Sequence, residues 1–368
     1  MKIGFNEGCN RFCENHSVLE DLDLCEKYGF DYIDIQSECL DREIAAGKYT
    51  IDDLAAWFAD PNHHLKMLSY NALIFFNMKQ TQEEKDAVMA KLDQIIADCN
   101  KLQCKMIVVV PSMDLPVHAT VDEIREDAVA VLKEMVKKVE PHGIKLSIEF
   151  CGAPTMSINR FEDAYDIVTE VNHPLVGITL DQYHFHAMAS EWAALEKADG
   201  KKIFVWHLNG MENMPCGAAY NNDEKRLWPG EPGDCLDHKR YADTLKKIGF
   251  EGDVCTMEVF RPDYYKLSSE ENIKKVISDE LAAVNKKYVM PRRTGRIEPH
   301  EVIEVSLEPE VEEYPVTIML SRDGYLKKMT DRVLKKATTL KYKDGDKPFI
   351  EFPSSNTHEL LVFTNKSQ

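Results

Sequence analysis

The sequence predicts an α/β fold, a closed (β/α)8 barrel that carries a small β-rich appendage at its C-terminal end. Short apolar runs alternate with longer amphipathic stretches along residues 1–290, which is typical of repeated βα units and of a parallel sheet. Eight such units can be counted, and eight units in this length favour a closed barrel over an open sheet. We therefore expect a TIM-barrel catalytic domain at 1–290 and a linker with a small β-rich extension at 291–368.

The predicted barrel strands are short apolar runs. They are KIGFN (2–6), DYIDIQ (31–36), KMLSYNALIFF (66–76), KMIVVVP (105–111), KLSIEF (145–150), VGITLDQ (176–182), KIFVWHL (202–208) and DVCTMEVF (253–260). Helical periodicity fills the segments between them, for example at 17–30, 83–102 and 121–143. The last of these segments ends on basic residues and then Gly143, a usual helix stop.

The C-terminal segment has a different pattern. It begins with a Pro- and Arg-rich stretch, PRRTGRIEPHE (291–301), which is consistent with a linker. Short strands are then predicted at VTIML (316–320), YLKKM (325–329), PFIEF (348–352) and LLVFT (360–364), with a turn at 321–324. We expect a small β unit here.

The charge of the chain argues against a nucleic-acid or membrane partner. Its 45 basic and 63 acidic residues give a formal net charge of −18, which repels phosphate backbones and anionic membranes. From Pro291 onward 13 basic residues balance 13 acidic ones, so the first 290 residues, with 32 basic and 50 acidic, carry the whole excess. No apolar run reaches the ~18–20 residues of a membrane helix, and the start has no signal-peptide pattern. We expect a cytoplasmic protein.

Several other chemistries lack their minimum motif. The sequence has no P-loop, GxGxxG turn, GxSxG elbow or HExxH pair, which argues against nucleotide, nicotinamide, serine-hydrolase and zincin sites. All ten cysteines lie in the first 290 residues without a CxxC pair, which favours reduced and mostly buried thiols over a metal or redox role.

Four consecutive predicted strands end on possible metal ligands, and a barrel active site forms at this carboxyl end. Glu149 ends the fifth strand, Asp181 the sixth, His207 the seventh and Glu258 the eighth. A single strand-end carboxylate would more often cap the next helix, but burying several at one mouth without a cation costs several kcal/mol each. Three carboxylates and one imidazole predict one divalent ion, with Mn²⁺ favoured and Zn²⁺, Co²⁺ or Mg²⁺ compatible.

Substrate contacts are predicted from the same mouth. His184 in DQYHFH lies just beyond the sixth strand, and Asn71 closes the third strand with an amide for a hydroxyl group. The long segment after His207 must lie over the mouth, where Arg226 could clamp substrate oxygens and Trp228 could shape the rim. A solvated loop whose arginine pairs with a surface acid is an equally good interpretation of that segment.

These residues, with the loop Arg226-Leu-Trp-Pro-Gly and the ending Glu258-Val-Phe-Arg-Pro, resemble the xylose-isomerase-like family of sugar isomerases and epimerases. Within it, the segments LDLCEKYGFDYIDI, NALIFFN, HFHAM, ADGKKIF and FRPDYYKLSSEE are similar to the inosose (2-keto-myo-inositol) isomerases over residues 1–290. The resemblance implies Glu149, Asp181, His207 and Glu258 as metal ligands, and His184 and Arg226 as substrate contacts. The stretch LNGMENMPCGAAYNND departs from the family pattern, which leaves the substrate open.

The expected chemistry is isomerisation or epimerisation of a keto-polyol or keto-sugar through an enediolate. A divalent ion would act as Lewis acid, while Glu149 and Glu258 would remove and return the proton in roles that the sequence does not divide. A lyase is the main alternative, either an inosose dehydratase or the large subunit of a C-glycoside-cleaving enzyme that works with a small partner protein. Homo-oligomer formation is equally compatible. A metal-dependent endonuclease on the same barrel would need more histidines and a basic DNA face.

The C-terminal segment resembles a different family. VTIMLSRDGYLKKM and LLVFTNKSQ are similar to part of one repeat of the C-terminal domain that DNA gyrase and topoisomerase IV carry on their larger, DNA-cleaving chains. One repeat cannot close a multi-bladed domain and its net charge is zero, so DNA wrapping is not implied. DNA binding through this segment remains a remote alternative function.

Overall fold

The computed structural model describes residues 2–113, 115–116, 118–217, 223–274, 312–336 and 340–360. The chain divides into two compact units, Met1–Val289 and Met290–Gln368, and each is described by itself. The predicted linker 291–301, and the predicted strand 360–364 apart from Leu360, lie outside the described residues. Within the described part of the chain, no helix is both long and apolar enough to cross a membrane.

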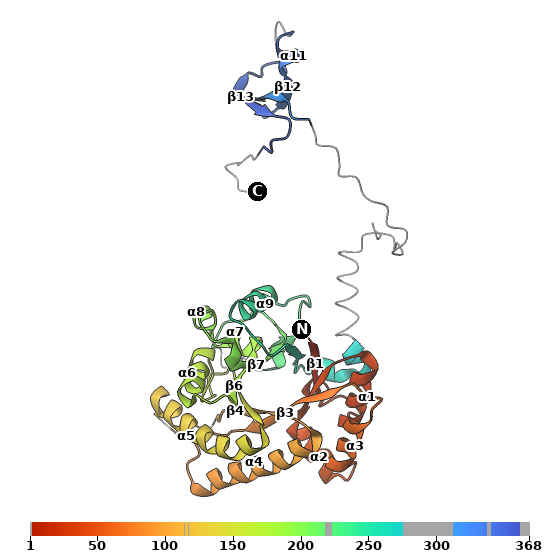
Figure 1. Ribbon diagram of the computed structural model, residues 1–368, viewed down its shortest axis with the longest axis vertical. Coiled ribbons are helices and arrows are strands. Elements are labelled where there is room, and N and C mark those ends of the chain that lie inside the picture. The colour runs from red at the N-terminus through yellow and green to blue at the C-terminus, as the bar shows by residue number, and fades with distance from the viewer. Residues whose placement is uncertain are drawn as a thin grey trace. The chain divides into compact units, whose positions relative to one another are not determined.

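Eight parallel strands close the barrel of the first unit, in the spatial order β1-β10-β7-β6-β5-β4-β3-β2 (Figure 1). They are β1 (Lys2–Asn6), β2 (Tyr32–Gln36), β3 (Lys66–Ile74), β4 (Met106–Val110), β5 (Lys145–Glu149), β6 (Val176–Asp181), β7 (Ile203–Leu208) and β10 (Val254–Met257). Each lies in one of the eight apolar runs of the sequence, so the predicted (β/α)8 barrel is confirmed.

Helices surround the barrel (Figure 1). They are α1 (Val18–Tyr28), α2 (Ser37–Ala45), α3 (Ile51–Ala59), α4 (Gln82–Leu102), α5 (Val121–Val139), α6 (Phe161–Val171), α7 (Gln182–Ala187), α8 (Trp192–Leu195) and α9 (His238–Lys247). The longest two, α4 and α5, begin with capping boxes at Thr81 and Thr120, whose side chains satisfy free N–H groups of the first turn. After α5 and one 3₁₀ turn, Gly143 takes φ 62°, the left-handed conformation that ends a helix.

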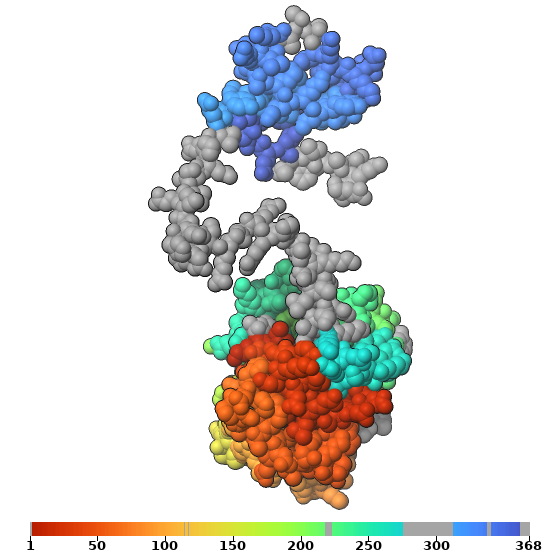
Figure 2. Space-filling view, turned by 90° about the vertical axis from the view of Figure 1, so that its right-hand side faces the viewer, coloured from red at the N-terminus to blue at the C-terminus, as the bar shows by residue number. Residues whose placement is uncertain are grey.

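The first and last strands close the barrel against each other. Phe5 of β1 is the register partner of Met257 of β10, and the side-chain amide of Asn272 donates to the carbonyl of Cys9 at 2.9 Å. Figure 2 shows the segment that ends at Lys274 packed against the first residues of the chain. Because all eight strands are parallel, their carboxyl ends meet on one face, where the polar residues that end them gather.

The long segment after β7 folds into a small hairpin. Its strands β8 (Gly210–Met211) and β9 (Arg226–Leu227) pair antiparallel, with Met211 opposite Arg226. The hairpin carries Arg226 back to the carboxyl ends of the barrel strands, where its guanidinium reaches Asp181.

The second unit is a three-stranded antiparallel sheet of order β12-β11-β13, followed in the chain after β12 by the short helix α11 (Asp331–Leu334). The strands are β11 (Pro315–Ser321), β12 (Leu326–Thr330) and β13 (Pro348–Ser355), which match three of the predicted strands. The predicted turn is present, since Gly324 N–H donates to the carbonyl of Ser321 at 3.1 Å. The predicted β-rich appendage is therefore confirmed.

Candidate active site

The structure brings the four predicted metal ligands together at the carboxyl ends of the barrel strands. Glu149 is the last residue of β5, Asp181 the last of β6, His207 lies on β7 and Glu258 directly follows β10. One ligand atom of each lies within 4.8 Å of those of the other three, and all four residues are buried. Strand order explains the convergence, because β5, β6, β7 and β10 are consecutive neighbours in the barrel.

Hydrogen bonds and ion pairs join the four residues directly. His207 Nδ1 lies 2.8 Å from Glu149 Oε1 and 3.1 Å from Glu258 Oε2. Arg226 Nη1 lies 2.6 Å from Asp181 Oδ2 and 3.4 Å from Glu258 Oε2. His207 and Arg226 thus supply the positive charge that three buried carboxylates require.

The surroundings push the pKa values of the two glutamates apart. Burial, together with the charge of Glu258, raises the pKa of Glu149 to about 8. Burial also disfavours the Glu258 carboxylate, but His207 and Arg226 outweigh it and hold the pKa of Glu258 below its usual range. Burial opposes the His207 imidazolium, yet Glu258 and Glu149 raise the pKa of His207 well above normal. Two carboxyl groups in one site therefore favour opposite protonation states.

The donor set fits a divalent cation. Three carboxylates and one imidazole converge within 4.8 Å, which is the oxygen-rich ligand set with one nitrogen that Mn²⁺ or Zn²⁺ accepts. In the structure the His207 imidazolium and a protonated Glu149 take the place of that charge. A cation bound by these four residues would displace both protons, because metal ligands bind in their deprotonated forms.

The sequence analysis missed one residue that orients a ligand. Asp34 of β2 lies inside the barrel with no exposed surface, and its Oδ1 accepts from Ser69 Oγ at 2.5 Å. Its other oxygen, Oδ2, faces His207 Nε2 at 3.8 Å, and neither atom has a hydrogen-bond partner among the described residues. His207 therefore has its Nδ1 toward the cluster and its Nε2 toward Asp34, the arrangement by which a carboxylate fixes the tautomer of a metal-ligating histidine.

Other missed residues hold the glutamate and aspartate ligands in place. Asn6 at the end of β1 donates to Glu258 Oε1 at 2.8 Å, and Asn209 donates to Asp181 Oδ2 at 2.8 Å. Both are strand-end residues like the ligands themselves. Strand-end position was therefore the signal that could have identified them.

Two of the predicted substrate contacts, His184 and Arg226, lie side by side in the site. Arg226 Nη2 lies 3.0 Å from His184 Nε2, and the backbone N–H of His184 donates to Asp181 Oδ1 at 2.8 Å. The Arg226 guanidinium is fully buried and also donates to Asp223 Oδ1, so it holds the site together in this structure. Contact of either residue with substrate remains a prediction.

The other two predicted contacts, Asn71 and Trp228, are also buried near this face. The prediction that Asn71 closes its strand is wrong, because the apolar run continues and β3 ends at Ile74; Asn71 Nδ2 still lies 3.4 Å from Glu258 Oε1. The Trp228 ring stacks on Tyr264 at 5.6 Å, and its indole N–H, although buried, makes no hydrogen bond to any described residue. Both remain predicted substrate contacts.

Comparison with known proteins places the barrel in a family. Residues 22–285 match the family model described as a xylose isomerase-like TIM barrel. The chain belongs to this family. It is 39% identical over 291 residues to the inosose isomerase of Bacillus velezensis, with 79% of this chain and 99% of that protein covered. The crystal structure of the IOLI protein with a bound zinc atom is 38% identical, has a TM-score of 0.71, and is covered over 79% of this chain and 100% of that one.

The C-terminal unit of this family member has a separate similarity. Over 102 residues the chain is 35% identical to the larger, DNA-cleaving chain of DNA topoisomerase 4 from Bacillus subtilis, with 27% of this chain and 13% of that protein covered. The resemblance predicted from the sequence is therefore confirmed. Because the match spans so little of the topoisomerase chain, no activity of that protein carries over.

Cation binding at the four-residue site is predicted to strengthen as pH rises. Below pH about 8 the ion must displace the Glu149 proton, and the His207 proton as well, so the apparent affinity for Mn²⁺ should rise at least about tenfold per pH unit between pH 6 and 7.5. Electron paramagnetic resonance of free Mn²⁺ measures this directly. An affinity independent of pH over this range would contradict the assigned protonation states.

Asp34→Asn is predicted to weaken Mn²⁺ binding about 10- to 100-fold, because the amide no longer fixes the Nε2–H tautomer of His207. Asp31→Asn is the matched control, since Asp31 lies just before the same strand and accepts only a backbone N–H from Ile3. Equal Mn²⁺ affinity of the Asp34→Asn variant and the parent protein would show that Asp34 plays no part in the site.

Proposed function

We propose that this chain is a divalent-metal-dependent isomerase or epimerase of a keto-polyol or keto-sugar, with inosose as the first candidate substrate. The observation that carries the proposal is the pair Glu149 and Glu258, two buried carboxyl groups that flank His207 and favour opposite protonation states. The 39% identity to an inosose isomerase over nearly its full length supports the choice of substrate.

The metal would be held by Glu149, Asp181, His207 and Glu258. When bound it would supply Lewis acidity toward a carbonyl and a neighbouring hydroxyl oxygen. The zinc in the 38% identical structure and the donor set of this chain both support a divalent ion, and Zn²⁺ and Mn²⁺ are the candidates to compare.

The protein's own residues divide the proton transfers. Glu258 is held in its ionised form by Arg226 and accepts a hydrogen bond from Asn6, so it is suited to remove the proton from the carbon between the two oxygens. Glu149, whose pKa is raised by burial, is suited to return a proton to the neighbouring carbon. His184, Arg226, Asn71 and Trp228 are the proposed contacts for the remaining hydroxyl groups.

The substrate and reaction type are tested together by ¹H NMR in D₂O, with the metal-loaded protein and either 2-keto-myo-inositol or a 3-keto C-glucoside. We expect solvent deuterium to enter the inosose while an isomeric ketone forms. Loss of water or of the aglycone would instead make the protein a lyase. Absence of any reaction with the inosose would refute the substrate assignment.

The roles of the two glutamates are tested by Glu258→Gln and Glu149→Gln in the same assay. We expect Glu258→Gln to lose both deuterium exchange and product formation, by at least about 10³-fold. We expect Glu149→Gln to lose product formation to a similar degree but to keep exchange at the first carbon. Metal content is measured for each variant, and substantial turnover by either metal-loaded variant would defeat the assignment.

A further inference from the structure

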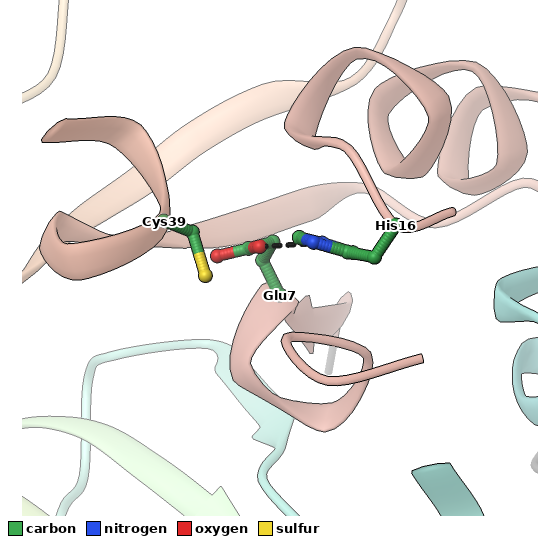
Figure 3. Close-up of side chains that lie close together, drawn as sticks. All are labelled: Glu7, His16 and Cys39. Atoms are coloured by element: carbon green, nitrogen blue, oxygen red, sulfur yellow. Dashed lines mark ion pairs between the residues drawn. The ribbon is translucent and has the colours of Figure 1, made fainter. Parts of the chain in front are cut away.

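A second buried cluster of metal-ligand side chains lies in the barrel unit, apart from the four residues above. Glu7 follows β1, His16 lies in the loop before α1, and Cys39 is in the first turn of α2. One ligand atom of each lies within 4.8 Å of those of the other two. Figure 3 shows the Glu7 carboxylate between the Cys39 thiol and the His16 ring.

Three carboxylates face the single imidazole of this cluster. His16 Nε2 lies 2.6 Å from Glu7 Oε1 and 3.2 Å from Asp21 Oδ2, and its Nδ1 lies 3.8 Å from Glu43 Oε1. The side chains of His16 and the three acids are at most 3% exposed. Such a concentration of buried negative charge requires positive charge in its midst.

The cluster attracts positive charge more strongly than its neighbours supply it. Burial opposes the imidazolium, yet hydrogen bonds and charges from Asp21 and Glu7 raise the pKa of His16 to about 10. Lys48 reaches Glu43 Oε1 at 3.3 Å, but it is about half exposed and touches only the outer acid of the three. The Nδ1 atom of His16 is buried and makes no hydrogen bond within the described part of the chain.

We propose that Glu7, His16 and Cys39, with Asp21 as the fourth ligand, form a structural Zn²⁺ site. A thiolate, an imidazole and carboxylate oxygens are the ligands that zinc takes in closed four-coordinate sites. Uptake of Zn²⁺ releases two protons, one from the His16 imidazolium and one from the Cys39 thiol. The net charge of the buried cluster is then unchanged, so the exchange requires no new countercharge.

The surroundings supply the outer contacts that such a site needs. Glu43 faces the far nitrogen of the His16 ring, as an orienting carboxylate does for a metal-bound histidine. Arg42 Nη2 lies 3.4 Å from Cys39 Sγ, where its charge favours the thiolate. Asn10 donates to Asp21 Oδ1 at 2.8 Å and leaves Oδ2 toward His16.

The site would fasten three segments that are far apart in the sequence. It joins the end of β1, the loop before α1, and α2. Glu7 Oε2 also accepts the backbone N–H of Gln36 at 3.0 Å, and the Gln36 side chain donates to Asn6 Oδ1 at 2.8 Å. Since Asn6 holds Glu258, an ion at Glu7 would also steady the support of that residue.

The test uses the thiolate ligand, which the four-residue site lacks. The full chain is produced in minimal medium with Co²⁺ in place of Zn²⁺, so that cobalt is incorporated as the protein folds. We expect about two equivalents of Co²⁺ per chain and a thiolate-to-cobalt charge-transfer band in the near ultraviolet. No such band in cobalt-saturated parent protein would overturn the proposal, whether or not the chain is an active isomerase.

Three variants assign the band. Cys39→Ser is expected to lose the band and one equivalent of cobalt, and His16→Gln to lose the same equivalent. Cys13→Ser is the matched control, because Cys13 is buried close by but its thiol points to Asn10 and to the Tyr264 carbonyl. A further variant, Cys151→Ser, tests the cysteine near Glu149. A band that persists in Cys39→Ser, or that disappears in Cys151→Ser, would place the thiolate elsewhere and refute this site.

Discussion

Mutual repulsion among three buried carboxylates at the mouth of the barrel is the constraint on which the active site depends. Glu149, Asp181 and Glu258 are brought together by strand order and cannot move apart without opening the sheet. Each unpaired charge there would cost several kcal/mol. The site therefore requires positive charge, and in the structure His207 and Arg226 provide it.

The residues around the cluster follow from this requirement. Arg226 is brought in by the β8–β9 hairpin, so the longest insertion of the barrel contributes a buried cation as well as covering the mouth. Asn6 and Asn209 donate neutral hydrogen bonds to the acids without adding charge. Asp34, which accepts, stands on the opposite side of His207 and opposes the proton-rich state of that ring only weakly at 3.8 Å.

Much of the barrel and the four converging residues could be predicted from the sequence, because strand periodicity and strand-end position are both local patterns. Asp34 could not, since alternation along β2 does not distinguish an acid that points into the barrel from one that points to solvent. Asn71 was misplaced because the apolar run of β3 extends three residues beyond it. The cluster of Glu7, His16 and Cys39 joins three segments, and only the closed barrel brings them together. Their separate positions in the sequence have no regular spacing, and the cysteine was reasonably interpreted as a buried thiol.

The closure of β1 on β10 has a consequence for the order in which this protein matures during synthesis. Glu258 follows the last strand, yet it is held by Asn6 from the first, so 252 positions separate the two halves of one hydrogen bond. A nascent chain that has not yet released β10 from the ribosome has neither a closed sheet nor a complete set of ligands. Completion of the barrel and completion of the site are thus a single late event, and premature termination upstream of Glu258 leaves a chain that lacks both.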